Sequence, residues 1–383
     1  MKGFETPEGV SDELFKEYKI KEDIVKKIRG VFKSFGYKRV STPTIEYYEI
    51  FSSIKSTILK DEMFKLIDSS GEILTLRPDA TIPIARIIAK NYKSDKGIYK
   101  VCYSTQVFKM KSEIKRERTQ TGIEYFGNPN AEADGEVIVS AIESLLECGV
   151  NFKIELGNAG YYKGLLNSTD LSEEEKMNLK NLIEYKNFVE LRNYVDTLEI
   201  SDELKKAIDA MPSLYGSFEE TLEEAAKYSV NDKMSSALEE LKEIYKFIKD
   251  YGYEEYVSLD LGLINNLDYY TGMMFKGYLE GYGDRILSGG RYDNLTHYYG
   301  ETIPATGFSI SVDDLIEGMM IQNKIEKDPV FTIDYKVNYK EGKRKEAIEK
   351  AKELRKEGFI VTLERVEDYD EAESENAENI INI

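Results

Sequence analysis

Histidine, cysteine and tryptophan are almost missing from this chain. Its 383 residues contain one His (His297), two Cys (Cys102 and Cys148) and no Trp. A single imidazole excludes a multi-histidine metal site, and two distant cysteines without a CxxC pair do not indicate a zinc knuckle or a disulfide framework. We therefore expect two reduced core thiols, no bound metal and no cofactor.

Positive charge is outnumbered by negative charge: the chain has 52 Lys and Arg against 71 Asp and Glu, a formal net charge of −19. Tight nucleic-acid binding needs several Lys or Arg on phosphates, so the charge counts against a tRNA-binding protein. No stretch approaches the ~20 apolar residues of a membrane span, and the N-terminus has no apolar signal segment. An apolar content of 41% and 28 Tyr predict a folded cytoplasmic protein of two to three domains.

The first third has a mixed helix and strand pattern. Apolar residues at helical spacing predict an amphipathic helix over residues 15–36, ended by Gly36. The strands alternate too irregularly for a doubly wound fold, and none is followed by GxGxxG or GxxxxGK[ST]. The further elements expected here are strands at 63–67, 72–76, 98–103 and 122–126 and helices at 80–90 and 132–148.

From about residue 159 to 250 glycine becomes rare and the pattern is almost wholly helical. We expect an insertion of roughly four helices, two of them started by capping boxes at Ser172 with Glu175 and at Ser217 with Glu220. Strand patterns resume at 256–263, 271–278 and 284–288. A last unit, residues 328–383, reads strand–helix–strand and is predicted to be a small α/β domain with parallel strands.

Two polar segments of the first third are candidate sites. In residues 76–81 (LRPDAT), Asp79 and Thr81 lie where a strand gives way to a helix, and together they can hold an ammonium group. Asp79 is equally suited to capping that helix. Gln120 and Glu124 share one face of a later strand and can both point into a pocket.

A basic hairpin loop precedes that strand. It can grip a phosphate or an acidic partner, or it is an ordinary solvated loop. Its cations are Lys109, Lys111, Lys115, Arg116 and Arg118.

Two later segments contain polar residues next to glycines. In residues 265–272 (NNLDYYTG), Tyr269 and Tyr270 suggest a pocket wall, although paired Tyr in strands mostly serve packing. In residues 287–293 (LSGGRYD), the Gly pair permits close approach of a ligand and Arg291 offers a fixed cation. The alternative is a turn with Arg291 in a structural ion pair.

In this order the segments resemble the class II aminoacyl-tRNA synthetase core, specifically histidyl-tRNA synthetase. TPTIEYYEIF is similar to motif 1, the dimer interface; FKMK…RERTQTGIEYFG to motif 2; and GGRYDNL…ATGFSISVDDL to motif 3. LRPDAT resembles the amino-acid-holding LRPE-G-T, and NNLDYYTG the histidyl signature R-G-L-D-Y-Y. The resemblance covers residues 1–320. It implies an α+β fold: an antiparallel sheet flanked by helices, with the helical insertion and the small C-terminal unit added.

Three positions depart from the synthetase pattern. Lys109 replaces the motif 2 Arg on the ATP α-phosphate, Asn265 the Arg of the histidyl signature, and Asp314 the motif 3 Arg on the γ-phosphate. Lysine lacks the bidentate fork of arginine, and a carboxylate repels phosphate, so all three clamps of adenylation are lost. The histidine-like pocket is kept at Thr81, Gln120, Glu124, Tyr269 and Tyr270, with Asp79 in place of Glu.

This combination is similar to the regulatory subunit of ATP phosphoribosyltransferase, a histidyl-tRNA synthetase paralogue. The resemblance implies a non-catalytic subunit that joins the short catalytic subunit in a hetero-octamer. Such subunits enable activity and allosteric histidine feedback in the first step of histidine biosynthesis. L-histidine would be held by Asp79 or Glu124 at its ammonium and by Gln120 and the Tyr pair at its imidazole, or would bind at the subunit interface. The alternative is a divergent histidyl-tRNA synthetase.

Overall fold

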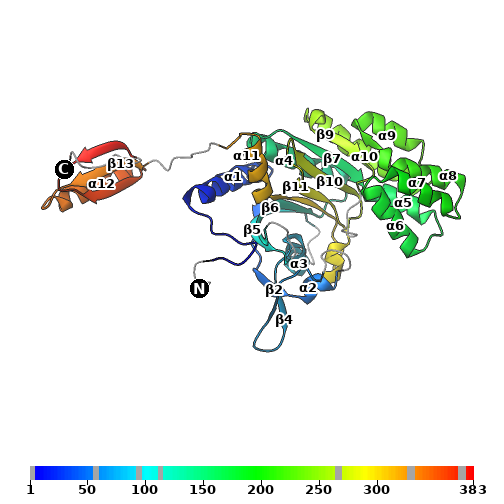
Figure 1. Ribbon diagram of the computed structural model, residues 1–383, viewed down its shortest axis with the longest axis horizontal. Helices are drawn as coiled ribbons and strands as arrows, with labels where there is room; N and C mark the ends of the chain where they lie inside the picture. Colours follow the sequence, from blue (N-terminus) through cyan, green and yellow to red (C-terminus); the bar gives the residue numbers. More distant parts are fainter. Residues whose placement is uncertain are drawn as a thin grey trace. The chain divides into compact units, whose positions relative to one another are not determined.

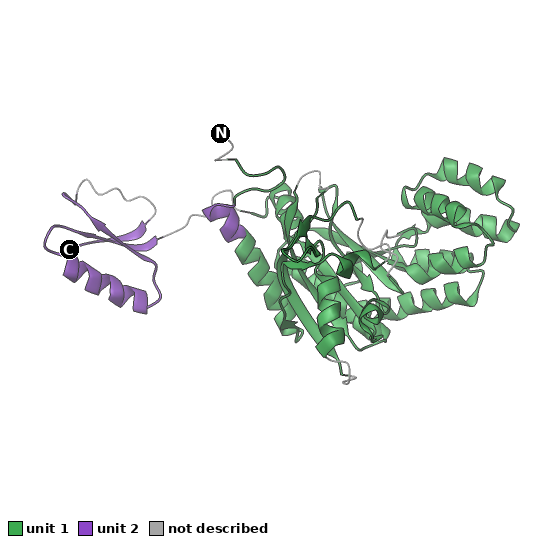
Figure 2. Ribbon diagram, turned by 90° about the horizontal axis from the view of Figure 1, so that it is seen from below, with its two compact units in different colours: residues 1–12, 21–325 green, residues 13–20, 326–383 purple. Residues whose placement is uncertain are grey.

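The computed structural model describes residues 5–54, 60–91, 97–110, 115–263, 270–325, 333–369 and 377–383. The chain divides into two compact units (Figure 2). The first comprises residues 1–12 and 21–325, and the second residues 13–20 and 326–383. Within the described ranges, no helix combines the length and the apolar content that a membrane crossing requires.

The first unit is built on a nine-stranded sheet (Figure 1). Most neighbouring strands are antiparallel, and only the pairs β1–β5 and β7–β9 are parallel. This confirms the predicted α+β core, an antiparallel sheet flanked by helices. In spatial order the strands are β1 (Lys38–Arg39), β5 (Tyr99–Phe108), β6 (Glu117–Phe126), β12 (Ala305–Ser311), β11 (Arg285–Arg291), β10 (Met273–Leu279), β7 (Phe152–Asn158), β9 (Val257–Asp260) and β8 (Tyr215–Gly216).

Helices cover one face of this sheet (Figure 1). Helix α1 (Phe15–Ser34) buries Ile24, Ile28 and Phe32 at four-residue spacing, as its predicted amphipathic pattern requires. The Phe32 ring meets Phe308 of β12 edge to face, with centroids 5.8 Å apart. Because side chains alternate along a strand, the neighbours of Phe308 face the opposite side of the sheet. Helices α4 (Ala131–Glu147) and α11 (Val312–Ile321) also pack on the central strands.

The opposite face meets helix α3 (Thr81–Asn91) and its apolar cluster. Beside it lies a small antiparallel sheet of β2 (Ile45–Tyr47), β4 (Ile73–Leu76) and β3 (Lys65–Ile67). Helix α2 (Glu49–Ser52) comes directly after β2 in the chain. The strand register places Tyr47, Leu74 and Leu66 side by side. The two strands predicted at 63–67 and 72–76 are confirmed as β3 and β4.

The helical insertion contains six α-helices rather than the four expected. No glycine occurs between Gly164 and Gly216, so the sequence does not mark the ends of the short helices in this stretch. The capping box at Ser172 is confirmed, whereas Ser217 makes no side-chain cap bond. The helices are α5 (Ala159–Asn167), α6 (Glu173–Glu184), α7 (Phe188–Thr197), α8 (Asp202–Ala210), α9 (Phe218–Ala226) and α10 (Asp232–Asp250), with 3-10 turns η1 (Met211–Ser213) and η2 (Glu254–Tyr256).

The second unit contains a three-stranded parallel sheet, order β14–β13–β15. Helix α12 (Arg344–Lys356) buries Ala347, Ala351 and Leu354 against it. The parallel strand–helix–strand unit is confirmed, and β15 in the acidic tail is an addition. Folding of residues 1–320 and 328–383 as independent domains stays a prediction. The strands are β13 (Ile333–Tyr339), β14 (Val361–Arg365) and β15 (Ala377–Asn382).

Candidate functional site

A buried carboxyl group, Glu124, lies at the centre of the site. It projects from β6 with 1% of its surface exposed. The Thr81 hydroxyl donates to its Oε1 at 2.8 Å, and the Tyr292 hydroxyl donates to its Oε2. Its register partner on β12 is Gly307, where a Cβ atom would lie 2.0 Å from Oε2. Glycine therefore leaves the space that this carboxyl group occupies.

The surroundings of Glu124 favour its neutral form. Burial raises its pKa to about 8, and the bonds from Tyr292 and Thr81 oppose that rise only in part, while nearby Asp79 adds to it. The group therefore takes up a proton more readily than an exposed glutamate does. A cation placed beside it would favour the ionised form, so the site can exchange a proton for a positively charged ligand.

Asp79 serves as the cap of helix α3, the structural alternative raised above. Its Oδ1 accepts a hydrogen bond from the Ile82 backbone N–H at 3.0 Å. Burial raises its pKa, and the Ile82 N–H and the Lys109 ammonium oppose that rise. Asp79 also raises the pKa of Glu124 electrostatically, so the capping carboxyl group acts on the buried one, and its predicted role in a ligand pocket stays a prediction.

Of the remaining predicted pocket residues, some lie in the described part of the chain and some do not. Gln120 lies on β6 and its Oε1 is buried without a hydrogen-bond partner among the described residues. Tyr270 is buried in the same apolar cluster as Tyr103 and Tyr292. Tyr269 and Asn265 lie outside the described residues.

Sequence reasoning missed two members of this group, Tyr103 and Tyr292. Tyr292 stands directly after Arg291 in a segment that the sequence singled out, but the attention there went to the arginine. Its partner Glu124 is 168 residues away, so local pattern gives no signal for the pairing.

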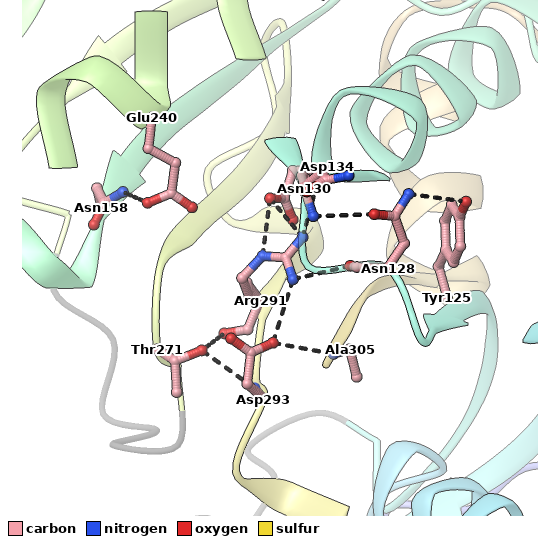
Figure 3. Close-up of polar contacts among 10 residues, drawn as sticks. All are labelled: Tyr125, Asn128, Asn130, Asp134, Asn158, Glu240, Thr271, Arg291, Asp293 and Ala305. Carbon is pink, nitrogen blue, oxygen red and sulfur yellow. Dashed lines mark hydrogen bonds and ion pairs between the residues drawn. The ribbon is translucent and has the colours of Figure 1, made fainter. Parts of the chain in front are cut away.

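Arg291 is a structural ion-pair partner and not a free cation (Figure 3). Its side chain is 5% exposed and forks onto Asp134 Oδ2, with Nε at 2.9 Å and Nη2 at 2.8 Å. Its other bonds go to the carbonyls of Asn128 and Asn130, each at 3.2 Å, and to Asp293 at 3.3 Å. These contacts hold the start of α4 to the end of β11.

The position predicted for the ATP γ-phosphate is occupied by an internal ion pair. Arg118 Nη1 of β6 lies 2.8 Å from Asp314 Oδ2 in the first turn of α11. The Tyr282 hydroxyl donates to the other oxygen of Asp314 at 3.3 Å. Asp314 is therefore a neutralised group rather than an isolated negative charge.

The neighbouring Asp313 is bound more closely. It accepts from the Thr119 N–H at 2.6 Å and pairs with Lys21 at 2.9 Å and Lys115 at 3.3 Å. Burial would raise its pKa, but the Lys21 and Thr119 bonds and the charge of Lys115 hold it below the usual range. Two cations of the basic loop, Lys115 and Arg118, are thus used within the chain, while Lys111 lies outside the described residues.

Other chemistry finds little support in the described part of the chain. His297 is exposed, and its Nδ1 contacts Thr302 Oγ1 at 3.2 Å. Cys102 and Cys148 are buried free thiols. No three His, Cys, Asp or Glu side chains among the described residues gather as metal ligands do.

Comparison with known proteins places this geometry among synthetase-like chains. The profile of the histidyl-tRNA synthetase family matches residues 9–315. The ATP phosphoribosyltransferase regulatory subunit of Clostridium botulinum (strain 657 / Type Ba4) is 40% identical over 341 residues, covering 87% of this chain and 81% of the relative.

Two solved structures have the same architecture. An ATP phosphoribosyltransferase regulatory subunit/histidyl-tRNA synthetase from Bacillus halodurans C superposes with a TM-score of 0.90 at 34% identity, covering 99% of this chain and 98% of that one. The histidyl-tRNA synthetase from Nostoc sp. PCC 7120 superposes with a TM-score of 0.81 at 21% identity, covering 97% and 87%, a likeness of fold.

Proposed function

Because the chain belongs to the family of ATP phosphoribosyltransferase regulatory subunits, we propose that it binds the short catalytic subunit of that enzyme and enables its activity. We further propose that it transmits feedback by L-histidine in the first step of histidine biosynthesis. As a member of this family it is a regulatory subunit, without catalysis of its own.

The observation that carries the histidine assignment is the pair of carboxyl groups at Asp79 and Glu124. Histidine brings an ammonium group. Burial raises the pKa of both carboxyl groups, which means that ionising them inside the protein is costly. A cation bound beside them stabilises their ionised forms and offsets that cost. The hydroxyls of Thr81 and Tyr292 fix the orientation of Glu124 before the ligand arrives. Gln120 offers a buried oxygen acceptor for an imidazole N–H.

The region of the lost ATP clamps argues against the alternative of a divergent synthetase. Arg118 is paired with Asp314, and Asp313 adds a second carboxylate to the same helix turn. Because these carboxylates already pair with Arg118, Lys21 and Lys115, the cations of this region are engaged within the chain instead of facing a triphosphate. The loss of a preorganised cation of this kind lowers rates by roughly 10²–10³ each.

The test is histidine inhibition of the complex reconstituted with the short catalytic subunit. We expect Glu124→Gln and Asp79→Asn to raise the histidine concentration for half-inhibition about tenfold to a hundredfold, since each removes a charge-assisted bond. Glu239→Gln on the exposed side of α10 is the matched control and should change nothing. Unchanged inhibition in both pocket variants would place histidine elsewhere, for instance at the subunit interface.

A second assay separates the two candidate functions. The purified chain alone should show no histidine-dependent ATP–pyrophosphate exchange. Robust exchange would make it a synthetase and would contradict the regulatory role.

We also propose that the chain forms a homodimer through motif 1, residues 42–51, which contributes β2 to the small sheet of β2, β4 and β3. Its apolar face leaves Tyr47 56%, Ile45 50% and Leu66 41% exposed in a single copy. Isolated surface apolar residues are ordinary, but a contiguous face of a sheet is typical of an interface. A second copy supplies an identical apolar face, as a two-fold dimer requires.

A further inference from the structure

A cavity lies between the strands of the main sheet and the helical insertion, toward the edge of the sheet that ends in β9 and β8. Its volume is about 260 Å³. The core contributes strands β7, β9 and β10, and the insertion contributes the end of α6 and the turn after it. The charged and aromatic lining consists of Glu155, Glu184, Lys186, Asp260, Lys276 and Tyr278.

This cavity is separate from the Glu124 site. Glu124 is on β6, and Lys276 is on β10, three strands away in the order β6–β12–β11–β10. None of Asp79, Thr81 or Glu124 lines the cavity.

Glu155 and Lys276 both line the cavity, and they attract each other electrostatically without forming a hydrogen bond or an ion pair. Glu155 and Lys276 are direct partners in the β7–β10 register, so they share one face of the sheet. Among the described residues, neither one has a hydrogen-bonding or ion-pair partner for its charged group. Partly buried charges of this kind are costly unless something else pairs with them.

An ion pair fixes the wall of the cavity. Lys186 Nζ, after the end of α6, lies 2.8 Å from Asp260 Oδ2 at the end of β9. The same ammonium lies 3.9 Å from the centre of the Tyr215 ring, and Asp260 Oδ1 accepts from the Gly262 N–H at 2.9 Å. This pair is internally satisfied, so it ties the insertion to the core and leaves Glu155, Lys276 and Glu184 for a ligand.

We propose that this cavity binds a free α-amino acid as its zwitterion, with the ligand carboxylate on Lys276 and the ligand ammonium on Glu155. Glu184 adds a second acceptor without a matching cation. The site therefore favours a basic side chain over a neutral one and rejects an acidic one.

The electrostatics of the lining agree with this assignment. Burial and the nearby Arg285 lower the pKa of Lys276, and burial and Asp260 raise the pKa of Glu155. A ligand with a carboxylate and an ammonium favours the charged form of each. The inference does not depend on the proposed function, because it concerns binding to the isolated chain.

The test is isothermal titration of the full-length chain with four probes. L-lysine should bind most tightly and L-alanine more weakly. L-glutamate, which adds a negative charge, and cadaverine, which lacks the carboxylate, should each bind at least about tenfold more weakly than L-lysine. Equal binding of cadaverine or L-glutamate would overturn the assignment, as would no binding of any probe.

Variants locate the site. Lys276→Met and Glu155→Gln should each weaken L-lysine binding roughly tenfold to a hundredfold, and Lys276→Arg should keep it within a few-fold. Lys242→Met and Glu239→Gln, at an exposed pair on α10, are matched controls. Thermal unfolding of each variant without ligand shows whether it is folded like the parent protein. Binding that survives Lys276→Arg, Lys276→Met and Glu155→Gln alike, but is lost in Glu124→Gln, belongs to the other pocket and overturns the inference.

Discussion

Burial raises the pKa of Glu124, and this has a consequence for stability as well as binding. Its folded pKa of about 8 lies above the ordinary value of 4.5. The folded state therefore binds a proton that the unfolded chain has released between these two pH values. Stability from this group is complete below the ordinary pKa and is lost as pH rises through the folded pKa.

Glu124→Gln should remove that pH dependence. The variant should gain stability relative to the parent as pH rises from 5 to 8, by up to about 1.4 kcal/mol per pH unit. Urea unfolding at pH 5, 6, 7 and 8 measures the difference. A difference that stays constant over this range would show that Glu124 is ionised in the folded chain. Asp134, whose pKa burial raises to about 6, is present in both proteins and cancels.

Gly307 is the residue that leaves room for Glu124. Gly307→Ala should cost about 1–3 kcal/mol, because the added Cβ overlaps Glu124 Oε2 and the Ile123 carbonyl. Gly30 occupies an exposed position of helix α1, where an added Cβ meets nothing within 4 Å. Gly30→Ala should therefore stabilise the folded protein by about 0.5–1 kcal/mol. Denaturant midpoints of the two variants should therefore move in opposite directions. A Gly307→Ala midpoint at or above the parent value would disprove the packing argument.

At the scale of elements, two serines with the same capping-box pattern differ in the structure, because only one of them caps its helix. Ser172 and Glu175 bond reciprocally at the start of α6, whereas Ser217 has the same spacing to Glu220 but no side-chain bond. The spacing alone cannot distinguish them, because the rotamer of an N-cap serine depends on the chain that enters the helix.

Ser172→Ala should destabilise the chain by about 1 kcal/mol, and Ser217→Ala by clearly less. Thermal unfolding of the two variants side by side is the measurement. Equal losses would mean that both caps operate in solution.

The sequence predicted elements where one face is buried regularly, as in α1, and failed where tertiary contacts decide. Strand β15 lies in an acidic tail and forms because β13 offers it an edge in parallel register. Within the site, Glu124 was predictable from strand alternation together with the family resemblance. The pairing of Arg118 with Asp314, 196 residues apart, was not, because only the folded sheet brings them together.

At the scale of the whole molecule, a net charge of −19 opposes self-association, so a homodimer needs a strong apolar contact. The exposed face of the β2–β4–β3 sheet offers one, and it is built from short strands around Tyr47.

If the proposed homodimer forms through this sheet, Tyr47→Lys should convert it to a monomer, because the substitution places a charge in the middle of the proposed interface. Multi-angle light scattering measures the mass. Tyr185→Lys, at a site 79% exposed after helix α6, is the matched control and should stay dimeric. A parent protein that is monomeric, or a Tyr47→Lys protein that is dimeric, would refute this interface.

The ion pair of Arg118 and Asp314 makes the loss of adenylation chemistry hard to reverse. Restoring the motif 3 cation by Asp314→Arg would leave Arg118 facing a second guanidinium, with Lys21 and Lys115 on the adjoining Asp313. The return path therefore begins with a destabilising step that yields no activity, since Lys109 and Asn265 are also changed.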